Sequence, residues 1–110
     1  MARLPRVGPK ELVLSQAARA DLVDIARYTT EAADEATAGR LAAKLDAELH
    51  KLARIGHGGV PREKLCPGLR LHIVGNYNIY FRVTATETRI VRVLNAAREE
   101  VELIQFEPHD

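Results

Sequence analysis

The sequence predicts a single α+β domain in which two helices cover one face of an antiparallel sheet. Two observations predict this class. Residues 16–55 repeat apolar side chains at spacings of three and four, as amphipathic helices do. Residues 69–94 instead hold three β-branched runs separated by turn-like breaks, which is typical of an antiparallel meander. A length of 110 residues suffices for one core without a metal or a disulfide.

A short strand and a capped helix are predicted at the start of the domain. The Leu-Val-Leu run within Glu11–Leu14 indicates the strand. Ser15 can N-cap the helix, because its hydroxyl can accept from free backbone N–H groups. Asp21 lies off the apolar stripe, so we expect it to be solvated. The stripe of this helix, residues 16–29, consists of Ala18, Leu22, Ile25 and Thr29.

A second, longer helix is predicted from Glu35 to Arg54, after a break at residues 30–34. Gly56, Gly58 and Gly59 end it, as glycine commonly does at a helix C-terminus. The short connection implies an antiparallel helix hairpin. One face of this helix carries Leu41, Leu45, Leu49 and Leu52.

The alternation along the three strands predicts an apolar face for the helices and a basic face left open. The strands are expected at residues 69–73, 77–83 and 89–94, with Gly75-Asn76 as a tight turn. Leu71, Ile79 and Phe81 should face the helices. A short helix or irregular tail should follow. The open face should carry Arg70, His72, Asn78, Tyr80, Arg82 and Arg92, with Ile90 and Leu94 beside them.

Charge is unevenly distributed along the chain, although the formal net charge is only +1. Residues 57–98 hold seven bases and two acids, whereas residues 99–110 hold five acids and neither lysine nor arginine. This pattern indicates an acidic partner for the sheet. A random scatter of surface charge is the alternative. A further hypothesis is that the acidic end folds over the basic face.

Several classes of site are disfavoured by the composition. Cys66 is the only cysteine, so no internal disulfide or thiolate metal cage is expected. His50 and His57 lack metal-ligand spacing. We therefore predict no cofactor, no metal and, because no apolar run is long enough, no membrane association. Residues 1–10 predict a flexible arm before a single domain at 11–110, in a cytoplasmic protein.

Several segments, taken in order, resemble the RelE/ParE superfamily of toxins from bacterial type II toxin–antitoxin systems. The stretch from Leu12 to Tyr28 is similar to the family opening, a strand followed by a helix with an Asp-Leu-x-x-Ile-x-x-Tyr stripe. Pro67-Gly-Leu-Arg and Tyr-Asn-Ile-Tyr-Phe-Arg-Val follow. The ending resembles one in which the position of Asn95 is usually histidine and that of Arg98 is often arginine.

Within the superfamily, the ParE-like branch resembles the chain best. That resemblance implies a non-catalytic toxin that inhibits DNA gyrase and is neutralised by a cognate antitoxin encoded beside it. It also implies that operator DNA is contacted only through the antitoxin. The partner-binding residues expected on this basis are Arg70, Tyr80, Arg82, Arg92, Asn95 and Arg98.

The alternative is the RelE-like branch, whose members are ribosome-dependent endoribonucleases that cut messenger RNA. His72, Arg82 and Arg98 would then form the catalytic site, since such cleavage needs an acid, a base and positive charge near the phosphate. Two departures disfavour it. Asn78 stands where the nuclease pattern has an arginine, and no tyrosine follows Arg98. A third possibility is a degenerate member retained only for operon binding or assembly.

Overall fold

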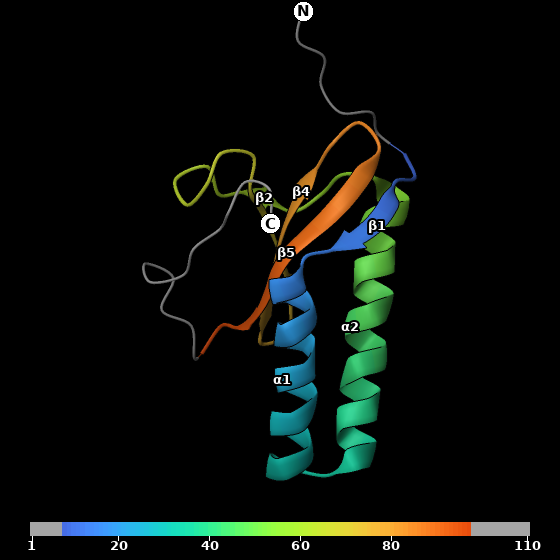
Figure 1. Ribbon diagram of the computed structural model, residues 1–110, viewed down its shortest axis with the longest axis vertical. Coiled ribbons are helices and arrows are strands. Elements are labelled where there is room, and N and C mark those ends of the chain that lie inside the picture. Colours follow the sequence, from blue (N-terminus) through green and yellow to red (C-terminus); the bar gives the residue numbers. More distant parts are fainter. Residues whose placement is uncertain (1–7, 98–110) are drawn as a thin grey trace, which may run out of the picture.

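The structure, a computed structural model, describes residues 8–97. Figure 1 shows the two helices side by side, covering the sheet and extending beyond its end. The predicted α+β class is confirmed. The first seven residues of the predicted arm and the predicted C-terminal helix or tail lie outside the described residues. The elements are β1 (Glu11–Leu14), α1 (Gln16–Ala32), α2 (Glu35–Ile55), β2 (Val60–Pro61), β3 (Arg70–Val74), β4 (Tyr77–Val83) and β5 (Glu87–Asn95).

The sheet has five strands in the order β1-β5-β4-β3-β2. The pairs β2–β3, β3–β4 and β4–β5 are antiparallel, as predicted. The pairing of β1 was not predicted: it pairs with β5 in parallel, with Glu11 opposite Glu87. Local patterns carry no information on this pairing, because the two strands are far apart in sequence. The two-residue β2 was also not predicted.

Ser15 fixes the start of α1, as predicted. Its Oγ accepts from the N–H of Ala18 at 3.0 Å. The same hydroxyl donates to the carbonyl of Val91 at 2.7 Å, so it also ties the helix to β5. The helix continues to Ala32, beyond the predicted end, and the hydroxyls of Thr29 and Thr30 donate to carbonyls one turn earlier within it.

Both ends of α2 have the expected capping chemistry. The carboxylate of Asp34 accepts from the N–H of Thr37 at 2.6 Å. This hydrogen bond from Thr37 lowers the pKa of Asp34 below its ordinary value of 3.8. At the other end, Gly56 adopts a left-handed conformation with φ of 77° and donates to the carbonyl of Leu52.

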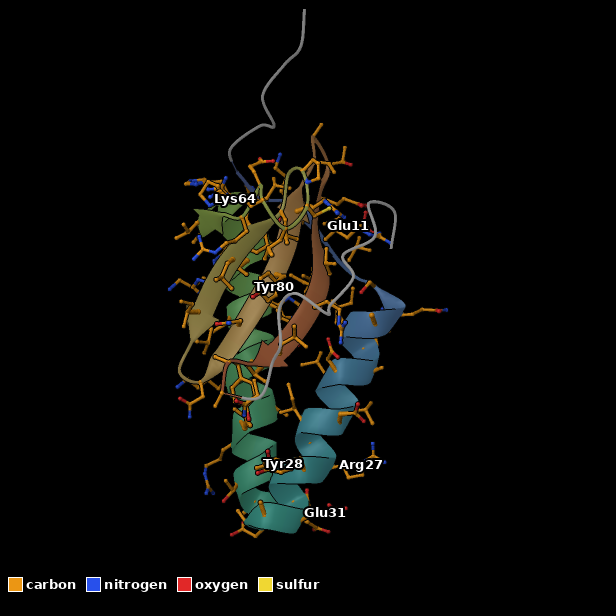
Figure 2. All side chains as sticks on the ribbon, turned by 90° about the vertical axis from the view of Figure 1, so that its left-hand side faces the viewer. Glu11, Arg27, Tyr28, Glu31, Lys64 and Tyr80 are labelled. Atoms are coloured by element: carbon orange, nitrogen blue, oxygen red, sulfur yellow. The ribbon has the colours of Figure 1, made fainter. Side chains whose placement is uncertain are left out.

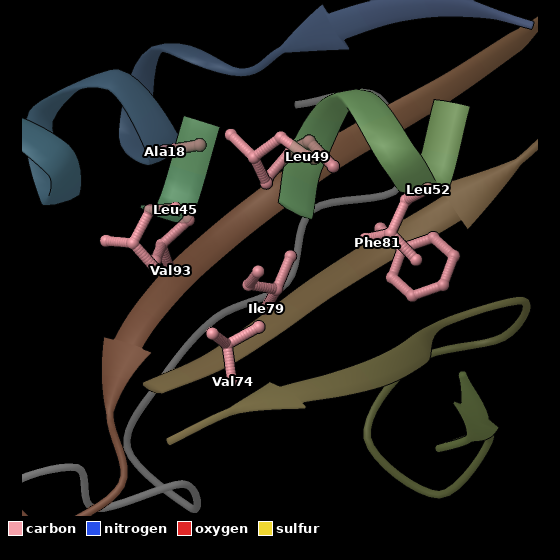
Figure 3. Packing of buried hydrophobic residues seen from close by; sticks show 9 residues of the cluster. Ala18, Leu45, Leu49, Leu52, Val74, Ile79, Phe81 and Val93 are labelled. Carbon is pink, nitrogen blue, oxygen red and sulfur yellow. The ribbon is translucent and has the colours of Figure 1, made fainter. Parts of the chain in front are cut away.

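The main core lies between the helix hairpin and one face of the sheet (Figure 3). Leucines of α2 pack here against aromatic and β-branched side chains of β4 and β5, which removes apolar surface from water. The predicted orientation of Ile79 and Phe81 towards the helices is confirmed. The buried members are Ala18, Leu45, Leu49, Leu52, Val74, Ile79, Phe81, Ile90 and Val93.

The predicted faces of β3 are wrong. The two-residue turn between β3 and β4 pairs His72 with Ile79 and Arg70 with Phe81. Directly paired residues of an antiparallel ladder share a face. Arg70 and His72 therefore lie on the helix side, and Leu71 lies on the opposite face, which we call the back face.

The predicted faces of β5 are right for Arg92, Val93 and Leu94 but wrong for the residues before them, Arg89, Ile90 and Val91. The register shifts between Tyr80 and Phe81, so that Phe81 pairs with Ile90 while Tyr80 pairs with Arg92. The extra residue, Val91, reverses the alternation from this point, as a β-bulge does. Ile90 is consequently buried on the helix side and not exposed beside the arginines.

The back face is partly covered, which corrects the prediction of an open face. The loop between β2 and β3 folds over it and buries a second apolar cluster. Tyr80 lies at its centre and is only 2% exposed. Asn78 is also buried. The cluster comprises Cys66, Leu69, Leu71, Tyr80 and Val91, with Leu65 and Leu94 packed against them.

Candidate partner-binding surfaces

The structure disperses the residues predicted to bind a partner. Arg70 donates to the carbonyls of Gly58 and Gly59 and so holds the chain after α2 in place. Tyr80 is buried on the back face. Arg82 and Asn95 lie at different places on the surface, as described below. Arg98 lies outside the described residues.

Arg92 is held by Asp21 of α1. Its Nε and Nη2 atoms donate to the two carboxylate oxygens, each at 2.8 Å, and the N–H of Val93 donates to the same carboxylate at 2.9 Å. Asp21 is only 9% exposed, so its predicted solvation is wrong. Because β1 ends at Leu14, its pairing with β5 stops at Ile90. Further along β5, the Asp21 carboxylate accepts the backbone hydrogen bond of Val93 that a neighbouring strand would otherwise accept.

Two arginines stand directly opposite each other on the back face. Arg82 of β4 pairs with Arg89 of β5. A guanidinium nitrogen of Arg82 contacts Sγ of Cys66, and Nη1 of Arg89 lies 3.6 Å from a carboxylate oxygen of Glu87. Like charges directly opposite in a sheet are unfavourable, so this position attracts anionic groups. The Arg82 face, as we call it, consists of Ile73, Arg82, Arg89 and Leu94.

A second surface lies on the other side of β5. A cleft of about 460 Å³ separates α1 from the adjoining ends of β4 and β5. Tyr28 is 47% exposed at this cleft, while Asp24 and Arg27 form an ion pair on its rim. Figure 2 shows Arg27, Tyr28 and Glu31 together on the part of the helix beyond the sheet. The Tyr28 cleft is lined by Ile25, Arg27, Tyr28, Tyr77, Leu94 and Asn95, among others.

Among the predicted partner-binding residues that the structure describes, only Asn95 lines the Tyr28 cleft. Arg92 is linked to the cleft through Asp21, its ion-pair partner, which lines it. The sequence analysis missed the cleft itself. A signal was present, because Asp24, Arg27, Tyr28 and Glu31 recur at spacings of three, one and three and so share a helix face.

Of the three residues named for the alternative nuclease site, the two that the structure describes, His72 and Arg82, lie on opposite faces of the sheet. Nε2 of His72 lies 3.3 Å from Oε1 of Glu48 in α2, on the helix side of the sheet. Arg82 lies on the back face. Within residues 8–97, no group of three or more metal-ligating side chains occurs. In the same part of the chain, no helix is long and apolar enough to cross a membrane.

Comparison with solved structures defines the class of fold. A structure described as the chromosomal ParDE toxin–antitoxin system from P. aeruginosa superposes with a TM-score of 0.71 at 22% identity. The match covers 78% of this chain and 95% of that chain. A search of curated proteins finds no match.

The chain belongs to the ParE toxin family. Residues 12–100 match the family described as the ParE toxin of the type II toxin–antitoxin system, parDE. The predicted superfamily and its ParE-like branch are thus confirmed, as is the function of a toxin in a type II toxin–antitoxin system. Membership also implies a cognate antitoxin as partner, as predicted.

Proposed function

We propose that this toxin acts by binding DNA gyrase and that its antitoxin neutralises it by binding the toxin directly. Inhibition of gyrase is the role associated with the ParE family. On this proposal the protein acts in the cytoplasm and reaches operator DNA only through the antitoxin.

The separation of His72 from Arg82 is the observation that carries the proposal. Cleavage of RNA requires a general base, a general acid and a cation around one phosphate. The sheet itself lies between the imidazole of His72 and the guanidinium of Arg82. Arg92 is engaged by the buried carboxylate of Asp21. This arrangement supports a toxin that binds its target and disfavours one that cuts RNA.

The Tyr28 cleft is the surface that we assign to the antitoxin. It is lined both by apolar side chains, Ile25 and Leu94, and by charged ones such as Arg27. An amphipathic helix can bury its apolar face in such a groove while its polar groups meet the rim. Tyrosine is also enriched among the residues that dominate binding energy at interfaces. Asn95, predicted as a partner-binding residue, would then take part.

Gyrase and ribosome assays test the target. Purified toxin should inhibit DNA supercoiling by gyrase, and addition of the antitoxin should restore it. Messenger RNA in a translating extract should remain intact at the same toxin concentration. Unaffected supercoiling together with cleaved messenger RNA would overturn the proposal and support the nuclease alternative.

A substitution at Tyr28 tests the antitoxin site. We expect Tyr28→Ala to weaken binding of the co-expressed antitoxin by about tenfold or more, measured by titration calorimetry, because a large anchoring side chain is lost. Val23→Ala is the matched control, since Val23 is 64% exposed on the same helix and does not line the cleft. Equal affinities for both variants would place the antitoxin elsewhere.

A further inference from the structure

The Arg82 face favours a ligand that carries both negative charge and apolar side chains. The opposed guanidinium groups of Arg82 and Arg89 favour carboxylates between them. On the same face, Ile73 is 60% exposed, and Leu94 is half-buried. Ile73 and Leu94 pair with the same residue of β4, Asn78, from either side. A segment that fits must therefore combine acidic with large apolar side chains.

The chain itself contains such a segment. Residues 99–110 hold five acids and neither lysine nor arginine. Large apolar residues are interspersed among these acids. They are Val101, Leu103, Ile104 and Phe106. The segment thus matches the Arg82 face both in charge and in apolar character.

The length of the chain allows the contact. β5 ends at Asn95, and residues 98–110 follow the described part. An extended segment of this length spans roughly 40 Å, at about 3.3 Å per residue. Arg89 lies only about 20 Å back along β5 from Asn95 by the rise of a strand. Tethering also gives the segment a high effective concentration at this face.

We propose that residues 99–110 bind back onto the Arg82 face of the same chain. Their carboxylates contact Arg82 and Arg89, and their apolar side chains cover Ile73 and Leu94. The basic surface of the toxin is thereby masked from other anionic groups. An acidic segment of a partner must displace residues 99–110 before it can bind there. The Tyr28 cleft shares Leu94 with the Arg82 face but none of its other residues. The proposed contacts with Arg82 and Arg89 therefore do not depend on the assignment of the antitoxin site or the target.

Paramagnetic relaxation in the full chain tests the proposal. A spin label is attached at Gln105→Cys, with Cys66→Ser to remove the second thiol. We expect the amide signals of Arg82 and Arg89 to lose most of their intensity, while those of Glu48 and Lys51 on α2 are retained. Reversing the charges of Glu99, Glu100 and Glu102 to lysine should restore the lost signals. The matched control reverses the charges of three exposed acids of the helices. This variant should not restore the lost signals. The three residues are Glu31, Glu35 and Asp46.

A second measurement avoids any change at Cys66. In the full chain with its native cysteine, the Nε–H signals of Arg82 and Arg89 should shift when Glu99, Glu100 and Glu102 are reversed, and should not shift in the control variant. Uniformly retained intensity would overturn the proposal. So would broadening that survives the charge reversal, or broadening centred on Tyr28. If a spin-labelled copy broadened the signals of an unlabelled copy in a mixture, residues 99–110 of a second molecule would be the occupant of the Arg82 face. This result would also overturn the proposal.

Discussion

Asp21 shows how much of this fold depends on one polar side chain. Its carboxylate accepts two hydrogen bonds from Arg92 and one from the backbone of Val93. We expect Asp21→Ala to lower the free energy of unfolding by about 2–4 kcal/mol, because a largely buried ion pair and a backbone donor lose their partner. Asp21→Asn should cost less, since its amide oxygen can still accept from Val93. Urea unfolding provides the measurement.

Asp24 supplies the control for Asp21, three residues away on the same helix. It pairs with Arg27, but both side chains are about two-thirds exposed, at 65% and 66%. Such surface pairs contribute little, so Asp24→Ala should change stability by less than about 0.5 kcal/mol. If the two alanine variants were equally destabilised, the role assigned to the Asp21 carboxylate would be wrong.

Thr88 is a residue at which the native side chain lowers stability. It is 0% exposed in β5, and its hydroxyl has no hydrogen-bond partner within the described part of the chain. We expect Thr88→Val to raise the free energy of unfolding by about 1 kcal/mol, because the side chain keeps its shape and loses an unsatisfied polar atom. Thermal unfolding should show a higher Tm. Thr84→Val should have the opposite effect, since the Thr84 hydroxyl accepts from the N–H of Glu87.

At the scale of the element, the start of α2 should respond to acid. The hydrogen bond from Thr37 lowers the pKa of Asp34 below 3.8 in the folded protein. A lowered folded pKa means that the ionised cap stabilises the fold above pH 3.8, and this contribution is lost as the pH falls through the folded value. Asp34→Asn should therefore retain capping at neutral pH and lose less stability than the wild type as the pH falls below 3.8. An NMR titration placing Asp34 at or above 3.8 would contradict this account.

Apart from the two-residue β2, the elements could be predicted from sequence, but the faces of two strands could not be predicted from alternation alone. Apolar spacing and the caps at Ser15 and Gly56 located both helices. For β3, counting outward from the Gly75-Asn76 turn would have placed His72 opposite Ile79 and so on the helix side. For β5, the extra residue Val91 reverses the alternation, and nothing local in the sequence marks it.

The candidate site was less predictable than the fold. Asp21 looked solvated because it lies off the apolar stripe, and its partner Arg92 is far away in sequence. The Tyr28 cleft depends on how α1 crosses the ends of β4 and β5. That placement follows from tertiary packing and not from any periodicity. The resemblance to the ParE-like branch nevertheless identified the family. It rests on the order of residue types along the chain and does not depend on which face of the sheet each side chain occupies.

At the scale of the whole molecule, one core joins the hairpin to the sheet. Leu49 of α2 is 2% exposed at its centre. We expect Leu49→Ala to lower the free energy of unfolding by about 2–5 kcal/mol, through lost burial and the cavity that remains. Helical and sheet signals should still disappear in a single transition, because both layers share this core. Separate transitions for the two layers would contradict a single cooperative unit.

The parallel pairing of β1 with β5 has a consequence for how the toxin is made. Among the strands within residues 8–97, β1 is synthesised first, whereas β5, with which it pairs, is synthesised last. The hairpin can form early, whereas its apolar face has no complete sheet to cover until residue 95 has left the ribosome. A nascent chain released before β5 would lack the strand between β1 and β4 and could not fold into this structure. Arrest or premature termination upstream of β5 therefore yields a chain that cannot join β1 to β4 in one sheet.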